Sequence, residues 1–468
     1  GVFLLGKNYL LKINLIGLVL IGHIVMYFKI VNSLKYSYFE YQLSPYWLTI
    51  LLLCIYIFLG EDFLFWKIVV LVNYVKNVFF LILYAITVNN SGIIIFKLPY
   101  IDPLLDSVVK AGTLMNIELL IIILFFLWCI YKNQKFEGQK IEIPKSDYEG
   151  NVWLLHFFII LLLITYAIPA KVDITNSLPS FLQTTYFFKI VLLLVYFESI
   201  EFFENKFINR SNFFIFTCIL SVLLLFFSLE NNRKNTIFLM LSVIFFLCAK
   251  FPEYKKIILV PSVTIGGVTF SVLTQSRFNT SVIEMFTNVD TIRSYFLPID
   301  EIATGLEIKN FNYEANFYQL FIDIFRPFLG IGFFVKSFLA KINVSGDFYH
   351  ERISYGGLGR PDQILPYTAQ VGNYSWVLLI IFTCIILYVG NYYDQKIKFC
   401  LKNPKNLDAR WTYVYVQIIL ILSQFQIINL TILVNKITFS TIIILMYFEL
   451  SKKRASNHSF EIYASGNG

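Results

Sequence analysis

Long apolar stretches recur along this chain, and they restrict its fold more than any other feature of the sequence. Hydrophobic residues make up 57% of the 468 residues and charged residues only 15%, whereas a soluble domain carries roughly 25% charged residues to face water. One buried core cannot hold such a surplus of apolar side chains. An α-helix needs about 20 mostly apolar residues to cross a hydrocarbon layer of roughly 30 Å. The sequence therefore predicts an all-α integral membrane protein.

Twelve stretches come close to this length, and the limits of several are soft, so eleven to thirteen spans are compatible with the pattern. We predict membrane helices near residues 9–30, 45–60, 64–88, 111–131, 152–169, 181–199, 212–229, 236–250, 256–275, 373–391, 411–430 and 434–450. The predicted organisation is nine helices within 1–275, one large loop domain at 276–372, three helices within 373–450 and a tail at 451–468.

The distribution of Lys and Arg between the short loops predicts how these helices are oriented, because cytoplasmic loops are enriched in both residues. One alternate set of loops carries seventeen of them and the other only six. The richer set consists of Lys132, Lys135, Lys140, Lys145, Lys206, Arg210, Lys250, Lys255, Lys256, Lys396, Lys398, Lys402, Lys405, Arg410, Lys452, Lys453 and Arg454. The poorer set consists of Lys35, Lys97, Lys110, Lys171, Arg233 and Lys234. We therefore predict that both termini are cytoplasmic and that the 276–372 loop is extracytoplasmic.

The predicted extracytoplasmic loop has internal structure of its own. Residues 313–327 carry apolar positions at helical spacing, which predicts a helix with one apolar face. These positions are Phe317, Leu320, Phe321, Ile324 and Phe325. The run 328–340 is too short to cross a bilayer and is expected to lie along the membrane interface. The stretch 343–363 is polar and rich in turn-forming residues.

A second apolar segment on the same predicted side, 91–110, is interrupted by Pro99 and Pro103. Proline disrupts a helix because it lacks the N–H and its ring clashes with the preceding turn. The segment is therefore expected to form a re-entrant or interfacial piece, and we interpret it as a membrane-hugging loop in preference to a functional lid.

Arginine is used unevenly across the predicted topology. Only nine of the 38 basic residues are Arg, and six of these nine lie on the predicted outer side. The six are Arg233, Arg277, Arg293, Arg326, Arg352 and Arg360. A guanidinium group grips phosphate or carboxylate with two parallel hydrogen bonds, whereas a lysine ammonium acts as a point charge. The outer arginines therefore indicate an anion site, unless they pair with acids of the same loop such as Asp290, Asp300, Glu314, Asp323 and Glu351.

Arg233 and Lys234 lie together in a short outer turn, 230–235, between two predicted helices. A pair of cations at the membrane surface requires an anionic partner or water. Lipid phosphates supply such a partner through snorkelling side chains, and a bound lipid diphosphate is the alternative.

His350 is the one histidine of the predicted outer loop, and acids precede and follow it in the sequence Asp347-Phe348-Tyr349-His350-Glu351. Imidazole titrates near neutral pH and can act as a general base, although a lone loop histidine is more often solvated. The sequence contains no metal-ligand spacing and no glycine-rich phosphate loop of the nucleotide-binding type. We therefore expect neither a metal nor a cofactor, and the modest net charge of +8 follows the predicted topology instead of indicating nucleic-acid binding.

A stretch near the end of the large loop carries a resemblance to a known family. It reads Gly356-Gly357-Leu358-Gly359-Arg360-Pro361-Asp362 and runs on to Gly372, at the start of the predicted tenth span. With about twelve spans, an outer arginine turn and one large late loop, the chain resembles the Wzy-type polymerases of O-antigen and capsular polysaccharide, which have the GT-C architecture of membrane glycosyltransferases. The family often has a carboxylate where Leu365 stands here, so Asp362 or Gln370 would take its place.

This resemblance implies a glycosyltransferase of the bacterial inner membrane that needs neither metal nor nucleotide. Such an enzyme transfers a growing glycan from undecaprenyl diphosphate onto a lipid-linked repeat unit at the outer face of the membrane. Its partners would be undecaprenyl-diphosphate-linked oligosaccharides, as donor and as acceptor, the lipid bilayer and a protein that regulates chain length. The resemblance implies neither a nucleic-acid partner nor a cofactor.

The same resemblance assigns roles to the polar residues already named. The diphosphate would be held by basic side chains, because positive charge stabilises a diphosphate leaving group. Arg233 and Arg277 are placed nearest to it, and the further candidates are Arg360, Arg352, Arg326 and Lys234. The acceptor hydroxyl would lose its proton to a base, for which His350, Asp362 and Glu351 are the candidates.

Three other functions remain open on the sequence alone. An O-antigen ligase has the same architecture and donor but a lipid A acceptor. A flippase or solute transporter is a different class, although transporters usually show inverted repeats and broken helices, and no repeat is visible here. A receptor or assembly scaffold is the third. A scaffold should tolerate Arg-to-Lys changes at residues 233, 277 and 360, whereas a diphosphate site should not.

Overall fold

The computed structural model describes residues 2–34, 38–60, 63–91, 103–135, 150–167, 184–228, 233–262, 297–325, 345–355, 364–402, 409–437 and 444–448. All regular structure within these ranges is helical, which confirms the all-α prediction. Six of these helices are long and apolar enough to cross a membrane, and a seventh is added if one bent pair forms a single span. The chain is thus an all-α protein with candidate membrane-spanning helices, and the count of twelve spans stays a prediction.

The six helices are contributed by both halves of the chain. They are α1 (Val2–Leu34), α2 (Leu43–Leu59) with the preceding turn η1 (Tyr38–Gln42), the continuous helix formed by α3 (Leu64–Tyr74), η2 (Val75–Phe79) and α4 (Phe80–Ser91), then α5 (Leu105–Lys135), α8 (Arg210–Phe227) and α18 (Trp376–Lys402). The remaining helices used below are α6 (Val152–Ala167), α7 (Thr184–Glu204), α9 (Arg233–Lys250), η3 (Pro252–Tyr254), α13 (Pro298–Leu306), η4 (Glu307–Phe311), α14 (Phe317–Phe325), α16 (Ser345–Tyr355), α17 (Tyr367–Tyr374), α19 (Ala409–Leu422) and α20 (Leu430–Ile437).

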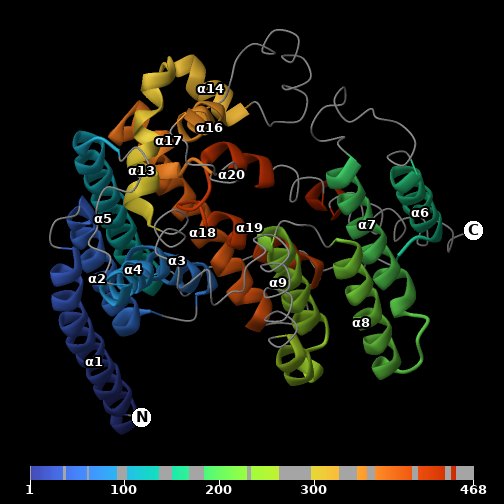
Figure 1. Ribbon diagram of the computed structural model, residues 1–468. Helices are drawn as coiled ribbons and strands as arrows, with labels where there is room; N and C mark the ends of the chain where they lie inside the picture. Colours follow the sequence, from blue (N-terminus) through green and yellow to red (C-terminus); the bar gives the residue numbers. More distant parts are fainter. Residues whose placement is uncertain are drawn as a thin grey trace, which may run out of the picture.

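The helices form two groups with a pair of helices between them (Figure 1). α1 to α5 and α18 make the first group, and α6, α7 and α8 make the second. α9 and α19 pack against each other and lie between the two groups. The short helices α13, α14, α16 and α17 gather at one end of the first group, where α13 contacts both η1 and α5.

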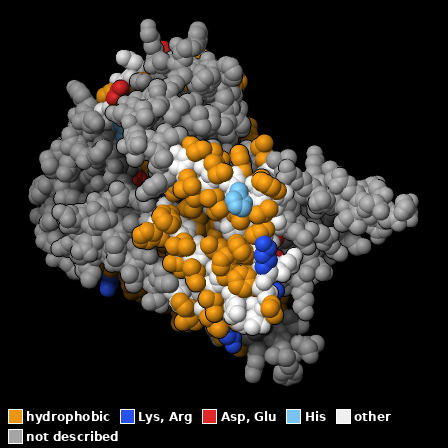
Figure 2. Space-filling model, turned by 90° about the vertical axis from the view of Figure 1, so that its right-hand side faces the viewer, with side chains coloured by type: hydrophobic (Ala, Val, Ile, Leu, Met, Phe, Trp, Pro, Cys, Tyr) orange, Lys and Arg blue, Asp and Glu red, His pale blue; other side chains and the backbone are white. Residues whose placement is uncertain are grey.

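Large apolar side chains cover much of the outer surface, which is the pattern expected where lipid replaces water as the solvent. The side of the molecule formed by α6, α7 and α8 shows mostly hydrophobic described side chains, with few Lys and Arg side chains near its margins (Figure 2). Trp153 on α6 is 81% exposed, and Leu163, Val222 and Phe226 are exposed on α6 and α8. A soluble protein rarely presents so continuous an apolar surface.

Polar contacts in the first group fix neighbouring helices against each other. Asp394 on α18 accepts the backbone N–H groups of Leu64 and Phe65, both at 2.8 Å, at the N-terminus of α3. A carboxylate there satisfies donors that have no partner within the helix and complements the helix dipole. The indole N–H of Trp66, which is fully buried, donates to Asn391 one turn earlier on α18 at 3.1 Å.

Two helix breaks stand out: the first falls between two separately predicted helices, 236–250 and 256–275, and the second falls inside one predicted helix. α9 and the helix after it meet at a bend of 114°, where Pro252 follows Phe251 and removes a backbone donor. The predicted span 411–430 is wrong as one continuous helix, because α19 ends at Leu422 and the chain turns through residues 423–428.

The second of these interruptions has a clear local cause. Asn429 caps α20: its side-chain Oδ1 accepts the N–H of Ile432 at 2.7 Å. Ser423 bonds back to the carbonyl of Leu420 at 3.3 Å. Ser and Asn side chains compete with the helical ladder in this way and favour caps and turns.

Three further segments, one of them in the large loop, differ from their sequence-based descriptions. α5 begins at Leu105, so the last residues of the 91–110 segment belong to a long helix; residues 92–102 lie outside the described ranges. The polar stretch expected to be turn-rich forms helix α16 over Ser345–Tyr355. The predicted tenth span is divided: α17 ends at Tyr374, Ser375 is extended, and α18 starts at Trp376.

The helix predicted within 313–327 is confirmed as α14, but its apolar face does not point into the protein as a whole. Phe317 is 84% exposed and Phe321 is also exposed, whereas Gln319 and Asp323 are buried. Leu320 is the predicted apolar position that is buried. The buried polar side chains find hydrogen-bond partners inside the loop, which leaves the two phenylalanines on the outside.

Candidate functional site

The short helices at the end of the first group form a unit that we call the loop assembly, defined as residues 297–325, 345–355 and 364–374. Two glycines allow its helices to approach closely. A Cβ on Gly305 of α13 would lie 2.7 Å from the Cβ of Ala369 on α17. A Cβ on Gly372 of α17 would lie 2.5 Å from a methyl group of Leu114 on α5. The loop assembly is therefore packed directly onto α5, a candidate membrane-spanning helix.

A fully buried carboxylate, Asp323 of α14, lies at the centre of the loop assembly. Its Oδ1 accepts the backbone N–H of Ser345 at 2.9 Å and the amide of Gln319 at 3.3 Å. Its Oδ2 accepts the hydroxyl of Tyr374 at 2.9 Å and the amide of Gln370 at 3.3 Å. Three helices, α14, α16 and α17, are thus joined through one side chain.

Two tyrosines extend this network from Asp323 to the segment that precedes α14. The hydroxyl of Tyr313 donates to that of Tyr374 at 2.5 Å, and Tyr374 donates to Asp323. The pKa of both hydroxyls is raised, first because burial disfavours the phenolate and then because the Asp323 carboxylate repels a second negative charge. Both tyrosines are therefore neutral donors at physiological pH.

Gln370 connects the same network to the helix that follows the broken span. Its Oε1 accepts the backbone N–H of Leu430 at 2.6 Å, at the start of α20, and its amide donates to the hydroxyls of Ser345 at 2.9 Å and Thr431 at 3.2 Å. Gln370 was one of the two residues expected to stand in for the family's carboxylate. It brings Asp323, a carboxylate from another helix, into contact with this segment.

A second buried carboxylate, Glu118 of α5, lies on the other side of α17. Its side chain is 1% exposed, and its Oε2 accepts the hydroxyl of Thr368 at 2.6 Å. Its Oε1 has no hydrogen-bond partner among the described residues. Lys76 of η2 interacts electrostatically with this carboxylate. Its ammonium group donates a hydrogen bond to the backbone carbonyl of Gln426 at 3.2 Å.

The predicted site residues fall into three classes in the structure. His350 and Glu351 lie next to each other on α16 and are both exposed, while Tyr349 beside them is fully buried. Arg233 and Lys234 form the first turn of α9, and Arg352 lies in α16, but nothing is described of these three side chains. Arg277, Arg326, Arg360 and Asp362 lie outside the described residues. Among the predicted site residues whose side chains are described, the structure therefore brings together the two exposed candidates for the base.

Sequence reasoning missed Glu118 and Lys76, although a signal was present. Both are charged residues within stretches that were predicted to cross the membrane, and charges at such positions usually mark function. Asp323 was named only as an acid that an arginine could neutralise. Its burial and its four hydrogen bonds required contacts between α14, α16 and α17, which no local pattern contains.

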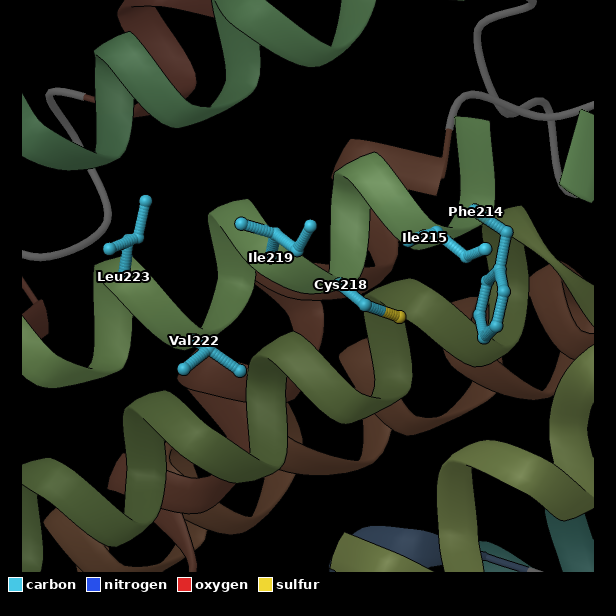
Figure 3. A pocket seen from close by; sticks show the side chains of 6 residues that line it. All are labelled: Phe214, Ile215, Cys218, Ile219, Val222 and Leu223. Carbon is cyan, nitrogen blue, oxygen red and sulfur yellow. The ribbon is translucent and has the colours of Figure 1, made fainter. Parts of the chain in front are cut away.

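The surface of α8 carries a shallow groove that is entirely apolar (Figure 3). Two rows of side chains at four-residue spacing line it: Phe214, Cys218 and Val222 form one row, and Ile215, Ile219 and Leu223 form the other. Without a polar group, the groove can hold only apolar chains. No group of three or more His, Cys, Asp or Glu side chains suited to a metal ion occurs in the described part of the chain.

No protein-family model matches this chain, and neither a curated protein nor a solved structure is similar to it.

Proposed function

We propose that this chain is a polysaccharide polymerase that transfers a growing glycan from undecaprenyl diphosphate onto a lipid-linked repeat unit. The observation that carries the proposal is the loop assembly. The described helices of this segment, one of which carries the predicted base, pack on α5 and are joined by Asp323 and Gln370 to each other and to α20. A membrane enzyme for lipid-linked sugars needs such a structured platform beside the bundle, where polar sugars and apolar lipid meet.

The proposal includes the membrane topology that the sequence predicts, with its number of spans and the location of its termini. We place the chain in the bacterial inner membrane, with about twelve spans in a GT-C-like arrangement and with both termini in the cytoplasm. In this topology the loop assembly lies at the outer face of the membrane. This placement is supported by the position of α13, which contacts η1 and α5 at one end of the first group. η1 and the start of α5 belong to the loops that are poor in Lys and Arg.

The chemical step requires charge at the leaving diphosphate and a base at the acceptor. We assign the diphosphate to the outer basic residues, with Arg233 and Arg277 nearest and Arg360 and Arg352 as further candidates. His350 or Glu351 would take the proton of the acceptor hydroxyl, because both are exposed on α16 and free to meet a substrate. The new glycosidic bond forms as the bond to the diphosphate breaks, and no nucleotide or metal takes part.

The direct test uses purified protein in liposomes with undecaprenyl-diphosphate repeat units from the source strain. Nucleotide sugar, ATP and added metal are omitted. A ladder of longer lipid-linked glycans is expected, and it should be lost in Arg233→Lys protein, because an ammonium cannot replace the planar guanidinium fork. A full ladder from the Arg233→Lys protein would remove the assigned anion site.

The matched control for this variant is Arg210→Lys. The Arg210 guanidinium donates to Glu253 at 2.6 Å and to the carbonyl of Lys250 at 2.9 Å, at the C-terminal end of α9. Arg233 starts the same helix, so the two arginines mark its opposite ends. Arg210→Lys should leave the ladder unchanged, because an exposed ion pair contributes at most about 1 kcal/mol.

A lipid-linked oligosaccharide flippase is the second candidate, and a specific observation favours it. Breaks occur in several helices, at Phe251, at Ser375 and at residues 423–428, and transporters often bind their substrates at discontinuous helices. The same liposomes distinguish the two proposals. Movement of the repeat unit across the bilayer without any ladder would support the flippase and remove the polymerase.

A further inference from the structure

Two oppositely charged side chains occupy the midpoints of two candidate membrane spans. Glu118 is the 14th residue of the 28-residue span Leu105–Lys132, and Lys76 is the 13th residue of the 25-residue span Leu64–Val88. Along an α-helix this is about 20 Å from either end. Charged groups at such depth are costly, and they commonly mark ion or proton pathways.

Glu118 is buried without being fully hydrogen-bonded. Thr368 donates to Oε2 at 2.6 Å, and the side chain of Gln426 is a further polar neighbour. Oε1 accepts no hydrogen bond from the described residues. A buried carboxylate oxygen without a donor is strongly unfavourable while it is charged. Binding of a proton removes that charge and turns the oxygen into a hydroxyl.

Lys76 supplies a positive charge without neutralising Glu118 by a direct bond. Its ammonium donates to the main-chain carbonyl of Gln426 at 3.2 Å, in the unwound turn between α19 and α20. Lys76 lies on the π-helical turn η2, Val75–Phe79. π-Helical turns inside α-helices occur frequently at functional sites, because they displace a side chain from the regular ladder.

The carboxylate is also connected to the loop assembly through α17. Thr368 on α17 holds Glu118, and Gln370, two residues further along the same helix, holds Asp323 and the start of α20. α17 has only eight residues and is separated from α18 by the extended Ser375. A change in the hydrogen bond at Thr368 therefore acts on a short helix that belongs to the loop assembly.

We propose that Glu118 is a proton-binding site in the middle of the bundle, with Lys76 as its counter-charge, and that its protonation is coupled to the position of α17. The proposal does not depend on the polymerase function. Proton binding converts the Glu118–Lys76 pair into a lone cation and a neutral acid. The electrostatic attraction between η2 and α5 is lost, and the acceptor for Thr368 is weakened.

Other titratable groups face this pair from the neighbouring helices. Glu301 on α13 acts on Lys76, and Tyr367 on α17 lies within electrostatic reach of Glu118. Cys384 on α18 acts on Tyr367. α2, which also packs on α5, carries no charged residue, and η1 carries only the exposed Glu40. Glu118 is thus the carboxyl group that interacts both with the charge of Lys76 and with the hydroxyl groups of Thr368 and Tyr367 on α17.

Infrared difference spectra of the whole protein in liposomes test the proposal. Spectra recorded over a series of pH values should contain a protonated-carboxyl C=O band that grows on acidification and is missing in Glu118→Gln protein. In Lys76→Gln protein the midpoint of this band should move to higher pH by about one unit, because a nearby opposite charge favours the carboxylate. A folded protein that shows no Glu118-dependent band at any pH would overturn the proposal.

Covalent labelling provides the independent measurement and its control. Dicyclohexylcarbodiimide is apolar and adds to protonated carboxyl groups, and the adduct is located by peptide mass spectrometry. Labelling of Glu118 should increase as the pH falls, whereas Asp323, whose two oxygens are both hydrogen-bonded, should react at least ten times more slowly. Equal pH-independent labelling of both residues would contradict a proton site at Glu118. If Thr368 couples Glu118 to the position of α17, Thr368→Val should loosen the attachment of α17 to α5. The expected result is faster proteolysis within 356–375, and an unchanged rate would contradict the coupling.

Discussion

Asp323 and Glu118 are both buried carboxylates that contact α17, but their surroundings differ. Asp323 receives four donors, which come from α14, α16 and α17. Glu118 receives one close donor, Thr368, and a weaker hydrogen-bonding contact from the Gln426 side chain, and its Oε1 keeps no partner among the described residues. In the first arrangement both carboxylate oxygens are hydrogen-bonded, and in the second one oxygen is left over, which is the basis of the proposed proton site. A fully bonded carboxylate therefore organises structure here, while a partly bonded one is free to take part in chemistry.

The largest difference between the two regions should appear when the carboxylates are deleted. Asp323→Ala leaves several buried donors without an acceptor, so we expect the free energy of unfolding to fall by about 3–5 kcal/mol. Unfolding in mixed detergent micelles measures this loss. Glu351→Ala, on the exposed side of α16, is the matched control and should change stability by less than about 0.5 kcal/mol. A loss of under about 1 kcal/mol for Asp323→Ala would remove its organising role.

The contact shared by the two regions is the approach of α17 to α5. Gly372→Val should destabilise the protein by about 1–3 kcal/mol, because its Cβ would lie 2.5 Å from a methyl group of Leu114. The thermal midpoint in detergent reports the effect. Leu114→Ala in the same protein opens space and should recover part of the loss. No recovery in the double variant would show that the clash lies elsewhere.

The tyrosines beside Asp323 make the stability of the loop assembly sensitive to alkali. Their pKa values are raised in the folded protein, so the folded state keeps protons that the unfolded state loses above about pH 10. Stability is therefore complete below that pH and declines as the pH rises further. Tyr313→Phe removes the hydrogen bond to Tyr374, which should cost about 1 kcal/mol at neutral pH and flatten the alkaline decline. Denaturant titrations at neutral and alkaline pH provide both readings, and an unchanged alkaline slope would contradict this explanation.

The smallest effect is expected for Glu118→Gln. The amide keeps an acceptor for Thr368 and carries no charge, so stability should change by at most about 1 kcal/mol in either direction. The same unfolding measurement applies, with Asp323→Asn as the comparison. A loss for Glu118→Gln as large as that for Asp323→Asn would show that both carboxylates are structural and would end the distinction between them.

The candidate site was predictable to a limited extent, and particular residues show why. His350 and Glu351 were proposed as candidate bases of the large loop; both are exposed on α16, and their role stays a prediction. The helix within 313–327 followed from its apolar spacing and is present as α14. The burial of Asp323 on that helix was not visible, because the pattern defined an apolar face that includes Phe317 but did not show that Phe317 would lie outside. Local periodicity reports which residues share a face, but not which face the rest of the protein covers.

The sequence by itself determined that this is an all-α chain with helices long and apolar enough to cross a membrane. That conclusion needs only the number of consecutive apolar residues, because lipid requires every backbone group to be bonded within its own helix. Only the tertiary structure decided where those helices break and which charges meet. The turn at 423–428 brings the carbonyl of Gln426 to Lys76, and α17 joins Glu118 to Asp323 across a separation of 205 residues in the sequence. Such contacts depend on how distant segments pack, and a linear pattern does not contain them.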